Sequence, residues 1–347
     1  MKKLVLEWRN KMGKRVLICF LGMVILLGGC GSVREKEVSN QNMEYPVKPI
    51  TIIVPYSPGG DSDMIARTME KLAIQYLGQP LIVVNKPGGG ATLGWNELAS
   101  ANPDGYTIGI TTIGAILQPL YSKTRYHYPT ALTPLAQVTT SPMAMTVLTE
   151  SPWQNVDDLI KYAKAHPGEL KYSHPGLGAT ANVVAEMFAT EAGITIEQVP
   201  FKGSSEALAA LLGGHVKVMF SNIASVKEQV KAGKLRVLAI ADPNRCEDPD
   251  LKNVPTFKEQ GVDLIFNNWQ GIGAPKGIPG DIQIKLALGI KNILSDPEFQ
   301  KNMEALGMKV EYLGPTEFGD KWNADNQRLN KVVKETGIAE RIAAQKN

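Results

Sequence analysis

The sequence has little of the chemistry that most enzymes and metalloproteins need. Its 347 residues contain only three cysteines and four histidines. The histidines show neither H-x-x-x-H nor H-E-x-x-H spacing, and a Cys/His zinc site needs more cysteines than the chain offers. The G-x-S-x-G nucleophile elbow and the G-x-x-x-x-G-K-[ST] phosphate loop are also absent. The sequence therefore predicts no catalytic residues, no metal and no cofactor.

Two weaker catalytic signals remain near residue 175. Gly176-Leu177-Gly178 follows a predicted strand, but the third glycine of a dinucleotide-binding fingerprint is replaced by Ala181. His174 is a candidate general base, and the alternative is a polar residue at the end of a strand. Neither signal identifies an enzyme class.

The composition has no extremes. Charged residues make up 20% of the chain and hydrophobic ones 44%, which argues against long disorder, collagen-like repeats and a multi-span membrane protein. A length of 347 residues predicts roughly two domains of about 150 residues each.

The apolar run at residues 16–27 is too short to span a bilayer, which takes about 20 apolar residues. Basic residues precede it and small residues follow it, as in a secretory signal peptide. Leu27-Gly28-Gly29-Cys30 resembles the bacterial lipobox, in which the cysteine carries lipid and becomes the mature N-terminus. We predict a lipoprotein signal peptide at 1–29 and a flexible tether at 30–44. The alternative is a plain signal peptide with an incidental Cys30.

The formal net charge of +3 belongs to this leader. Six of the 37 basic residues and one of the 34 acidic ones lie in residues 1–29, so residues 30–347 carry a net charge of −2. Nothing in the charge balance then favours nucleic acid as a partner. With Cys19 in the leader and Cys30 as the lipid site, only Cys246 remains, and no intramolecular disulfide is predicted.

Short apolar runs alternate with segments of helical periodicity along the rest of the chain. We expect the first helix to begin with Asp61 or Ser62 as N-cap and to stop at Gly78. The alternation predicts an α/β architecture with mainly parallel sheets. The expected strands lie at 50–54, 81–84, 107–110, 145–148, 170–173, 198–199, 216–220 and 235–240, and further helices near 155–166, 180–192, 204–213, 225–232, 280–295, 297–306 and 315–336.

Three glycine-containing loops share one design. Residues 55–63, 85–92 and 174–180 each follow a predicted strand, and the first and third lead into predicted helices. Glycine lets the backbone approach a ligand closely, and the first N–H groups of a helix point outward with a favourable dipole. In open α/β sheets, such loops at the carboxyl ends of strands form the ligand crevice. Their presence in both parts of the chain predicts a cleft between two domains that binds an anion.

A series of short motifs resembles one protein family along nearly the whole chain after residue 44. Their order and spacing are similar to those of the Bug-type solute-binding proteins of tripartite tricarboxylate transporters. The motifs include Tyr45-Pro46-Val47-Lys48-Pro49-Ile50, Pro58-Gly59-Gly60-x-x-Asp63-x-x-Ala66-Arg67, Asn85-x-Pro87-Gly88-Gly89-Gly90, Pro103-Asp104-Gly105-Tyr106-Thr107, Gly178-Ala179-Thr180, Val199-Pro200-Phe201-Lys202-Gly203 and Trp269-x-Gly271.

The resemblance implies a two-lobed, periplasmic-binding-protein-like (type II) α/β fold with a ligand cleft between the lobes. Lobe 1 is expected at 45–142 plus 267–347, and lobe 2 at 143–266. A chain that crosses twice between lobes makes Trp269 a residue beside the hinge, and an ordinary packed aromatic is the alternative.

The resemblance also implies which residues hold a ligand carboxylate. We expect main-chain N–H groups of the first two loops to bind it, with the third loop holding the distal end of the ligand. Pro58 can only shape its loop, because proline has no N–H, and Asp63 is expected to cap the helix or orient the loop rather than meet a carboxylate. The expected ligand-binding residues are Tyr56, Ser57, Pro58, Gly59, Gly60, Asp63, Gly90, Ala91, Thr92, Gly178, Ala179, Thr180, Lys202, Ser221 and Asn222.

Two positions depart from the family pattern. Asn182 stands where the family often has His, and Ser221-Asn222 where it often has Asp-Asn. Without that acid, recognition of a ligand ammonium is less expected, so the sequence favours a plain organic acid over an amino acid.

The sequence thus predicts a lipid-anchored receptor outside the cytoplasm that captures a small carboxylate or dicarboxylate and delivers it to membrane transporter subunits. It is not expected to be an enzyme. An alternative is a sensing module that signals to a membrane kinase. A surface hydrolase is a third hypothesis, and it would require Ser57 or Thr180 to act as nucleophile.

Overall fold

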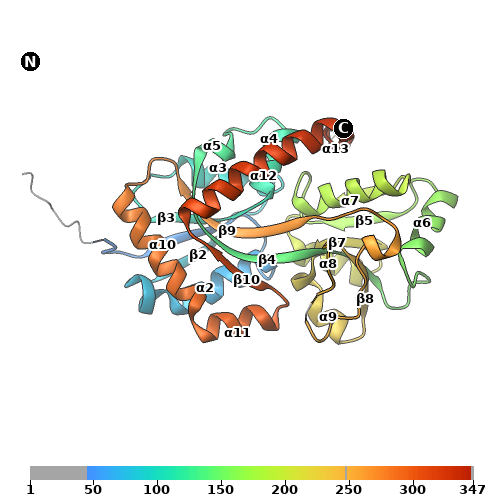
Figure 1. The fold of residues 1–347 in the computed structure, drawn as a ribbon, viewed down its shortest axis with the longest axis horizontal. Coiled ribbons are helices and arrows are strands. Elements are labelled where there is room, and N and C mark those ends of the chain that lie inside the picture. Colours follow the sequence, from blue (N-terminus) through green and yellow to red (C-terminus); the bar gives the residue numbers. More distant parts are fainter. Residues whose placement is uncertain (1–44, 247, 345–347) are drawn as a thin grey trace, which may run out of the picture. The chain divides into compact units, whose positions relative to one another are not determined.

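The computed structural model describes residues 45–246 and 248–344. The predicted signal peptide, tether and lipidation site at Cys30 lie outside the described residues. From Tyr45 onward the chain forms one unit of mixed strands and helices (Figure 1).

Ten strands form a continuous sheet system in the order β2-β1-β3-β9-β4-β7-β5-β6, with β10 and β8 also paired to β4. The first part contains β1 (Ile50–Val54), β2 (Leu81–Asn85), β3 (Thr107–Thr112), β9 (Asn267–Pro275), β10 (Lys309–Leu313) and the first part of β4 (Leu132–Leu148). The second contains the rest of β4 with β5 (Lys171–His174), β6 (Glu197–Pro200), β7 (Val218–Asn222) and β8 (Leu235–Ile240).

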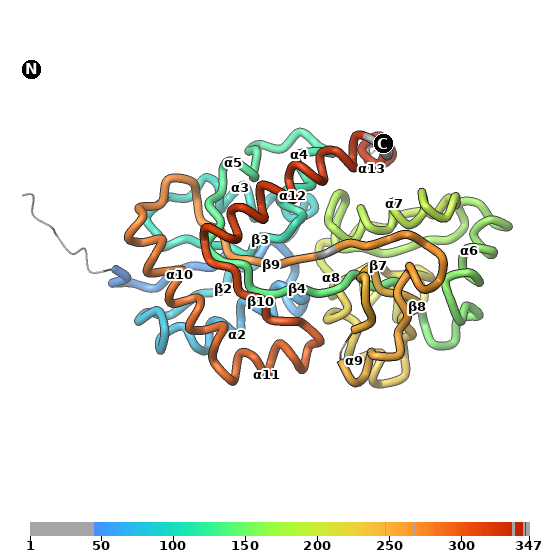
Figure 2. The backbone as a smooth tube through the Cα atoms, in the orientation of Figure 1, coloured from blue at the N-terminus to red at the C-terminus, as the bar shows by residue number. Residues whose placement is uncertain are grey.

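Strand β4 belongs to both parts of the sheet. Its residues from Leu132 to Pro142 pair with β9, and from Met143 onward it pairs with β7 and β8. Figure 2 shows β4 and β9 running side by side from one half of the unit to the other. The change of partner falls at the lobe boundary that the sequence predicts, although the exact boundaries stay a prediction.

Helices cover both faces of the first half. The first apolar cluster joins Ile50, Ile52 and Val54 of β1 to helices α2 (Asp61–Leu77), α10 (Gly280–Ser295) and α11 (Pro297–Ala305). Ile53, whose side chain points to the opposite face, belongs to the cluster that contains Trp95 and Trp322. That cluster includes side chains of α3 (Thr92–Ser100), α4 (Gly114–Tyr121), α5 (Tyr128–Ala131) and α12 (Pro315–Thr336).

The second half has its own helices around β5, β6, β7 and β8 (Figure 1). They are α6 (Val156–Ala165), α7 (Thr180–Ala192), α8 (Ser204–Leu212) and α9 (Lys227–Lys231), with short 3₁₀ turns at Ile223–Ser225 and Lys258–Gln260. The C-terminal helix α13 (Ile338–Ala344) packs against α7, where Arg341 Nε lies 3.5 Å from Glu186 Oε2.

Trp269 lies on β9 within an aromatic cluster. It is fully buried against Phe318 and Trp322 of α12, and its Nε1 donates to Asp325 Oδ2 at 2.9 Å. Its partner on β4 is Thr140, two residues before the point where β4 changes sheets. Trp269 therefore joins a packed core to a strand that links the two halves.

The structure corrects two expectations about local structure. In the described residues five strand pairings are antiparallel and four are parallel, so the sheet is mixed rather than mainly parallel. The linking strands β4 and β9 cause this difference, because each pairs antiparallel with its neighbours. Asp61 and Ser62 lie inside α2, whose N-cap is Gly60 with no side-chain cap.

Candidate ligand-binding site

The three predicted loops lie where strands end and helices begin. The loops after β1, β2 and β5 lead into α2, α3 and α7, respectively. The two halves bring these loops together, because main-chain and side-chain contacts join the first and second loops to residues of the second half. The three loops therefore lie close together at strand ends, and their role as a ligand site stays a prediction.

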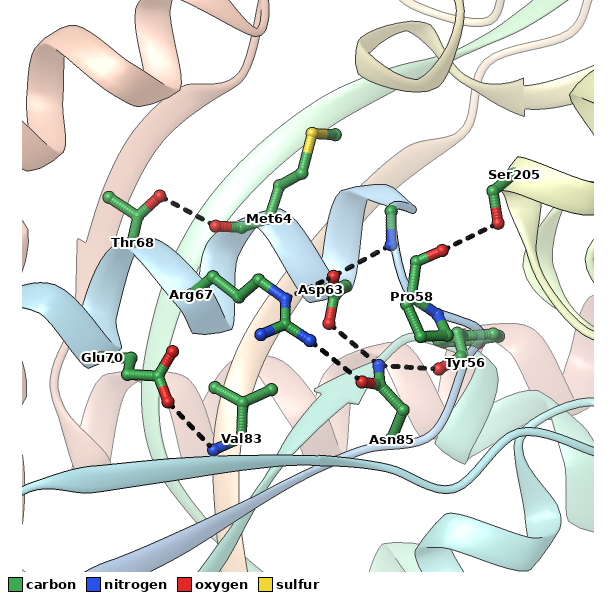
Figure 3. A network of polar contacts seen from close by, with 11 residues as sticks. Tyr56, Pro58, Asp63, Met64, Arg67, Thr68, Glu70, Val83, Asn85 and Ser205 are labelled. Carbon is green, nitrogen blue, oxygen red and sulfur yellow. Dashed lines mark hydrogen bonds and ion pairs between the residues drawn. The ribbon is translucent and has the colours of Figure 1, made fainter.

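Asp63 holds the first loop in shape (Figure 3). Its Oδ2 accepts hydrogen bonds from Gly59 N at 2.9 Å and Arg67 Nε at 2.8 Å, and its Oδ1 accepts one from Asn85 Nδ2 at 2.9 Å. Although burial acts to raise the pKa of Asp63, these hydrogen bonds from Arg67, Gly59 and Asn85 keep that pKa below its usual value. Its carboxylate is thus occupied by the chain itself and orients the loop.

The first loop also contacts helix α8 of the second half. Ser57 Oγ donates to Glu206 Oε1 at 2.7 Å. Figure 3 shows the second contact, in which Ser205 Oγ donates to the carbonyl oxygen of Pro58 at 3.0 Å. Both contacts are polar and involve short side chains. They join the first loop to the second half.

The second and third loops meet through their main chains. Gln118 Nε2 donates to the carbonyl oxygens of Gly90 at 2.9 Å and Leu177 at 2.8 Å, which joins the two halves. A Cβ on Gly90 would lie 2.3 Å from both Leu177 O and Gln118 Nε2, and one on Gly176 would lie 2.7 Å from Gly90 Cα. Only glycine permits this approach.

Ala91 has a backbone conformation that alanine rarely adopts. Its φ is +80° at the N-cap of α3, and its side chain is buried. The left-handed region costs a non-glycine residue about 1–2 kcal/mol. Such strain persists where the surroundings enforce it, and it is concentrated at ligand sites and switches.

A small cavity of about 30 Å³ lies between the first and third loops. From the predicted set it is lined by Tyr56, Ala179, Thr180, Ser221 and Asn222. This volume accommodates about one water molecule, so a larger ligand requires the two halves to separate or the lining side chains to move. Its other lining residues are Asp61, Ser62, Thr112, Met143, Pro175, Ala181, Ser204 and Asn268.

Asp61 places a buried carboxylate in this small cavity. It is 7% exposed, and its Oδ2 accepts hydrogen bonds from Gln270 Nε2 at 2.6 Å and from Asn222 Nδ2. Burial raises the pKa of Asp61, and hydrogen bonds from Asn222, the main-chain N–H groups of Ser62 and Asp61, and Gln270 act in the opposite direction. The sequence pattern suggested only a helix cap at this position.

A larger cavity of about 410 Å³ adjoins the second and third loops. Predicted residues Gly90 and Thr92 line it, together with Gln118 and the two cationic residues Lys123 and Arg125. Gly90 and Gln118 belong to the contact that joins the two halves.

Not every predicted residue reaches a cavity. Lys202 is exposed and lines neither cavity, and its main-chain N donates to Glu206 Oε2 at 3.2 Å. Ser57, Pro58 and Gly59 form or support contacts between loops instead. Gly178 N donates to Asn182 Oδ1 at 2.9 Å, so Asn182, where the family often has His, shapes the third loop.

Within residues 45–246 and 248–344, no group of three or more His, Cys, Asp or Glu side chains is placed to hold a metal ion. In the same residues, no helix has the length and apolarity to cross a membrane. The hydroxyls, amides and helix ends around the small cavity can bind a small polar molecule by hydrogen bonds.

Together, the mixed sheet system, the linking strands and the loop site define a two-lobed, periplasmic-binding-protein-like fold. Residues 65–344 match the model of the TctC family, described as the tripartite tricarboxylate transporter family receptor, and the chain belongs to this family. The Bug-type resemblance is thereby confirmed.

Known relatives support both the family and the fold. Protein BugT of Bordetella pertussis (strain Tohama I) is 32% identical over 325 residues, covering 92% of this chain and 97% of BugT. The structure of R. palustris Rpa4515 with adipate has a TM-score of 0.80 and 30% identity, covering 85% of this chain and 99% of that one. MatC (Rpa3494) from Rhodopseudomonas palustris with bound malate has a TM-score of 0.79 and 28% identity, covering 83% of this chain and all of that one.

His174 lies directly before the third loop and is fully buried. Its Nδ1 lies 2.8 Å from Gly176 O, and its Nε2 lies 2.7 Å from Gln198 Oε1. Burial lowers the pKa of His174 to about 4, although these hydrogen bonds with Gln198 and Gly176 act to raise it. The neutral imidazole is thus a structural part of the loop.

We expect His174 to make the protein less stable in mild acid. Because its pKa is about 4 in the folded state and near 6.5 when unfolded, the unfolded state binds more protons between these values. The contribution of neutral His174 to the free energy of unfolding is fully present above pH 6.5. It declines as the pH falls toward 4, by roughly 3 kcal/mol at most. Denaturant unfolding at pH 7.5 and pH 5 measures this decline.

From pH 7.5 to pH 5, the free energy of unfolding should fall less in His174→Gln than in the unsubstituted protein. His127→Gln is the matched control, because His127 is exposed and should leave the pH dependence unchanged. Equal pH dependence in all three proteins would contradict the assignment to His174.

Proposed function

We propose that this protein captures a small organic acid outside the cytoplasm for a tripartite tricarboxylate transporter. One observation carries the proposal: the N-terminus of α7 faces the small cavity. Ala179, Thr180 and Ala181 line that cavity, and the helix has no side-chain cap. The first N–H groups of a helix lack intrahelical partners and carry a partial positive charge, so they suit a carboxylate.

Hydroxyl groups complete the donor side of this site. Tyr56 Oη lies 3.5 Å from Thr112 Oγ1, and both residues line the small cavity with Thr180 and Ser221. Burial raises the pKa of Tyr56, so its hydroxyl stays protonated and can donate. Relatives whose structures hold adipate and malate support a carboxylate as the ligand class.

Ligand capture proceeds by closure of the two halves. The contacts Ser57–Glu206, Pro58–Ser205 and Gln118–Leu177 join the halves in the present arrangement. Because the small cavity of this arrangement is too small for a dicarboxylate, the lining side chains must move when the halves close on a ligand. A ligand that binds the closed form better than the open form shifts the population toward closure. The closed form then presents its surface to the membrane subunits.

The N-terminal sequence extends the proposal to location. A basic leader, a short apolar run and Leu27-Gly28-Gly29-Cys30 support export and attachment of lipid to Cys30. Residues 30–44 would then tether the receptor to the membrane. No covalent chemistry on the ligand is part of this function.

A carboxylate panel tests the ligand class. We expect succinate, malate, glutarate, adipate, L-aspartate or L-glutamate to raise the melting temperature and to give a calorimetric binding signal, because ligand that binds only the folded state stabilises it. Methylamine and glucose serve as non-carboxylate controls. The absence of binding by every carboxylate in a folded sample would overturn the proposal.

Gly90→Ala should prevent full closure. Its new Cβ would lie 2.3 Å from Leu177 O and Gln118 Nε2, so the second and third loops could not keep their contact. We expect at least a tenfold loss of carboxylate affinity and a smaller ligand-induced change in small-angle scattering than in the unsubstituted protein.

Gly78→Ala is the matched control for this closure test. Gly78 has a similar φ of +74° at the end of α2, but nothing lies within 4 Å of the added Cβ. Both substitutions therefore carry left-handed strain, and only Gly90→Ala obstructs the contact between halves. Equal affinities for the two variants would argue against closure through this contact.

Cys30→Ser should release the protein from the membrane. With Cys30 intact, expression in a bacterium fed radiolabelled palmitate should give a labelled protein in the membrane fraction. The serine variant should lack the label and appear in the soluble extracytoplasmic fraction. Membrane retention of an unlabelled Cys30→Ser variant would exclude lipid as the anchor.

A further inference from the structure

One end of the small cavity is rich in hydrogen-bond acceptors. Asp61 supplies a buried carboxylate, and Asn268, which is 3% exposed, has an Oδ1 atom with no hydrogen-bond partner among the described residues. A buried polar atom without a partner costs about 1–3 kcal/mol, so such atoms are uncommon. Both residues line the cavity.

The orientation of the amides follows from the carboxylate. Asn222 must turn its Nδ2 toward Asp61, because an amide oxygen there would face a carboxylate oxygen. Its Oδ1 then accepts from Asn268 Nδ2, which leaves Asn268 Oδ1 as the remaining acceptor. Flipping Asn268 would place two amide oxygens against each other.

The other neighbours of Asp61 strengthen this arrangement. Gln270 directs its Nε2 to Asp61 Oδ2, while its Oε1 accepts from Ser62 Oγ at 2.6 Å. The hydroxyl of Ser204 lies 3.5 Å from Asp61 Oδ1. Every side chain around the carboxylate is thus a neutral donor, and the described residues contain no ion pair to Asp61.

A buried carboxylate that has only neutral partners is costly, and an opposite charge would offset much of that cost. Lys202 does not supply such a charge, because it is exposed and lines neither cavity. The N-terminus of α2 contributes a partial positive charge, but that same position is the one expected to attract the ligand's carboxylate. Asp61 therefore repels a carboxylate from the first loop.

We propose that the ligand carries a protonated amino group as well as a carboxylate, and that Asp61 and Asn268 bind the amino group. This inference rests on the proposed function and specifies its ligand class. The carboxylate lies at the N-terminus of α7, which also lines the small cavity. An ammonium has three donors, which match the Asp61 carboxylate, Asn268 Oδ1 and one hydroxyl of the lining.

The proposal reverses the expectation drawn from Ser221. The acid that Ser221 lacks is supplied by Asp61, which is hydrogen-bonded to the neighbouring residue Asn222. A carboxylate from helix α2 thus takes the place of one from strand β7. The sequence alone does not show that Asp61 takes this role, because residues 61 and 222 are far apart in the chain.

Matched ligand pairs test the proposal by calorimetry: L-aspartate against succinate and L-glutamate against glutarate. We expect the amino member of at least one pair to bind the unsubstituted protein at least tenfold more tightly. Asp61→Asn keeps the size, removes the charge and leaves one acceptor oxygen in place of two. It should weaken binding of that amino acid roughly 10- to 100-fold and leave its plain partner unchanged or tighter.

Two further variants make the test independent of one substitution. Asn268→Ala removes the unpartnered acceptor and should also lower the ratio of affinities between the amino acid and its plain partner. This variant keeps the test available if Asp61→Asn fails to fold. Asp325→Asn removes another buried carboxylate, which lies outside both cavities beside Trp269. This control should keep the preference of the unsubstituted protein.

The outcomes separate this inference from the function on which it rests. If plain dicarboxylates bind as tightly as their amino partners and neither Asp61→Asn nor Asn268→Ala changes the ratio, the amino-group assignment is wrong and the receptor function stands. If no carboxylate of either kind binds the folded protein, the receptor function itself fails, and with it this inference.

Discussion

The antiparallel pairing of β4 with β9 is the constraint on which the rest of the structure depends. It extends from Leu132 opposite Pro275 to Pro142 opposite Asn267, and β4 continues from there to pair with β7 and β8 of the second half. Each half then places its loops relative to these two strands: β3 pairs with β9, and β7 pairs with β4. A hydrogen-bonded pair of strands can bend or twist more easily than it can separate, so it permits the halves to move relative to each other while it keeps the three loops opposed.

The halves share one apolar cluster that includes Tyr121 and Phe188, and the contacts beside the loops are polar. Ser57–Glu206, Gln118–Leu177 and Asp61–Asn222 are hydrogen bonds that water can replace when the halves separate. Each such bond contributes about 0.5–1.5 kcal/mol net, so these bonds alone oppose opening only weakly. A ligand that contacts both halves binds the closed form more tightly than the open form. This difference in binding free energy shifts the equilibrium between the two forms toward closure. The main-chain contact of Gly90 with the third loop needs glycine for the same reason: the halves must approach closely and also part.

Patterns in the sequence predicted the features that depend on local physics. Apolar runs located β1, β2, β3 and β8, and glycine-rich turns located the three loops, because burial and positive φ impose residue types directly. Strand β9 was missed since Gly271, Gly273 and Pro275 weaken any strand pattern, and the first part of β4 was missed since it contains Pro134 and several polar residues. These strands are specified by their partners across the sheet. The role of Asp61 was missed for a related reason: its partners Asn222 and Gln270 lie 161 and 209 residues away.

The polarity of the small cavity explains how a nearly neutral protein can select an anion. Residues 30–347 carry a net charge of −2, so long-range attraction contributes nothing, and selection depends on fields that act over a few ångströms. In the lining of this cavity, the N-terminus of α7 supplies donors, and Asp61 with Asn268 supplies acceptors. A ligand with two carboxylates binds the donors and is repelled by the Asp61 carboxylate, whereas a ligand with a carboxylate and an ammonium binds both. Asp61 therefore contributes to specificity through the ligands it excludes as well as through the one it binds.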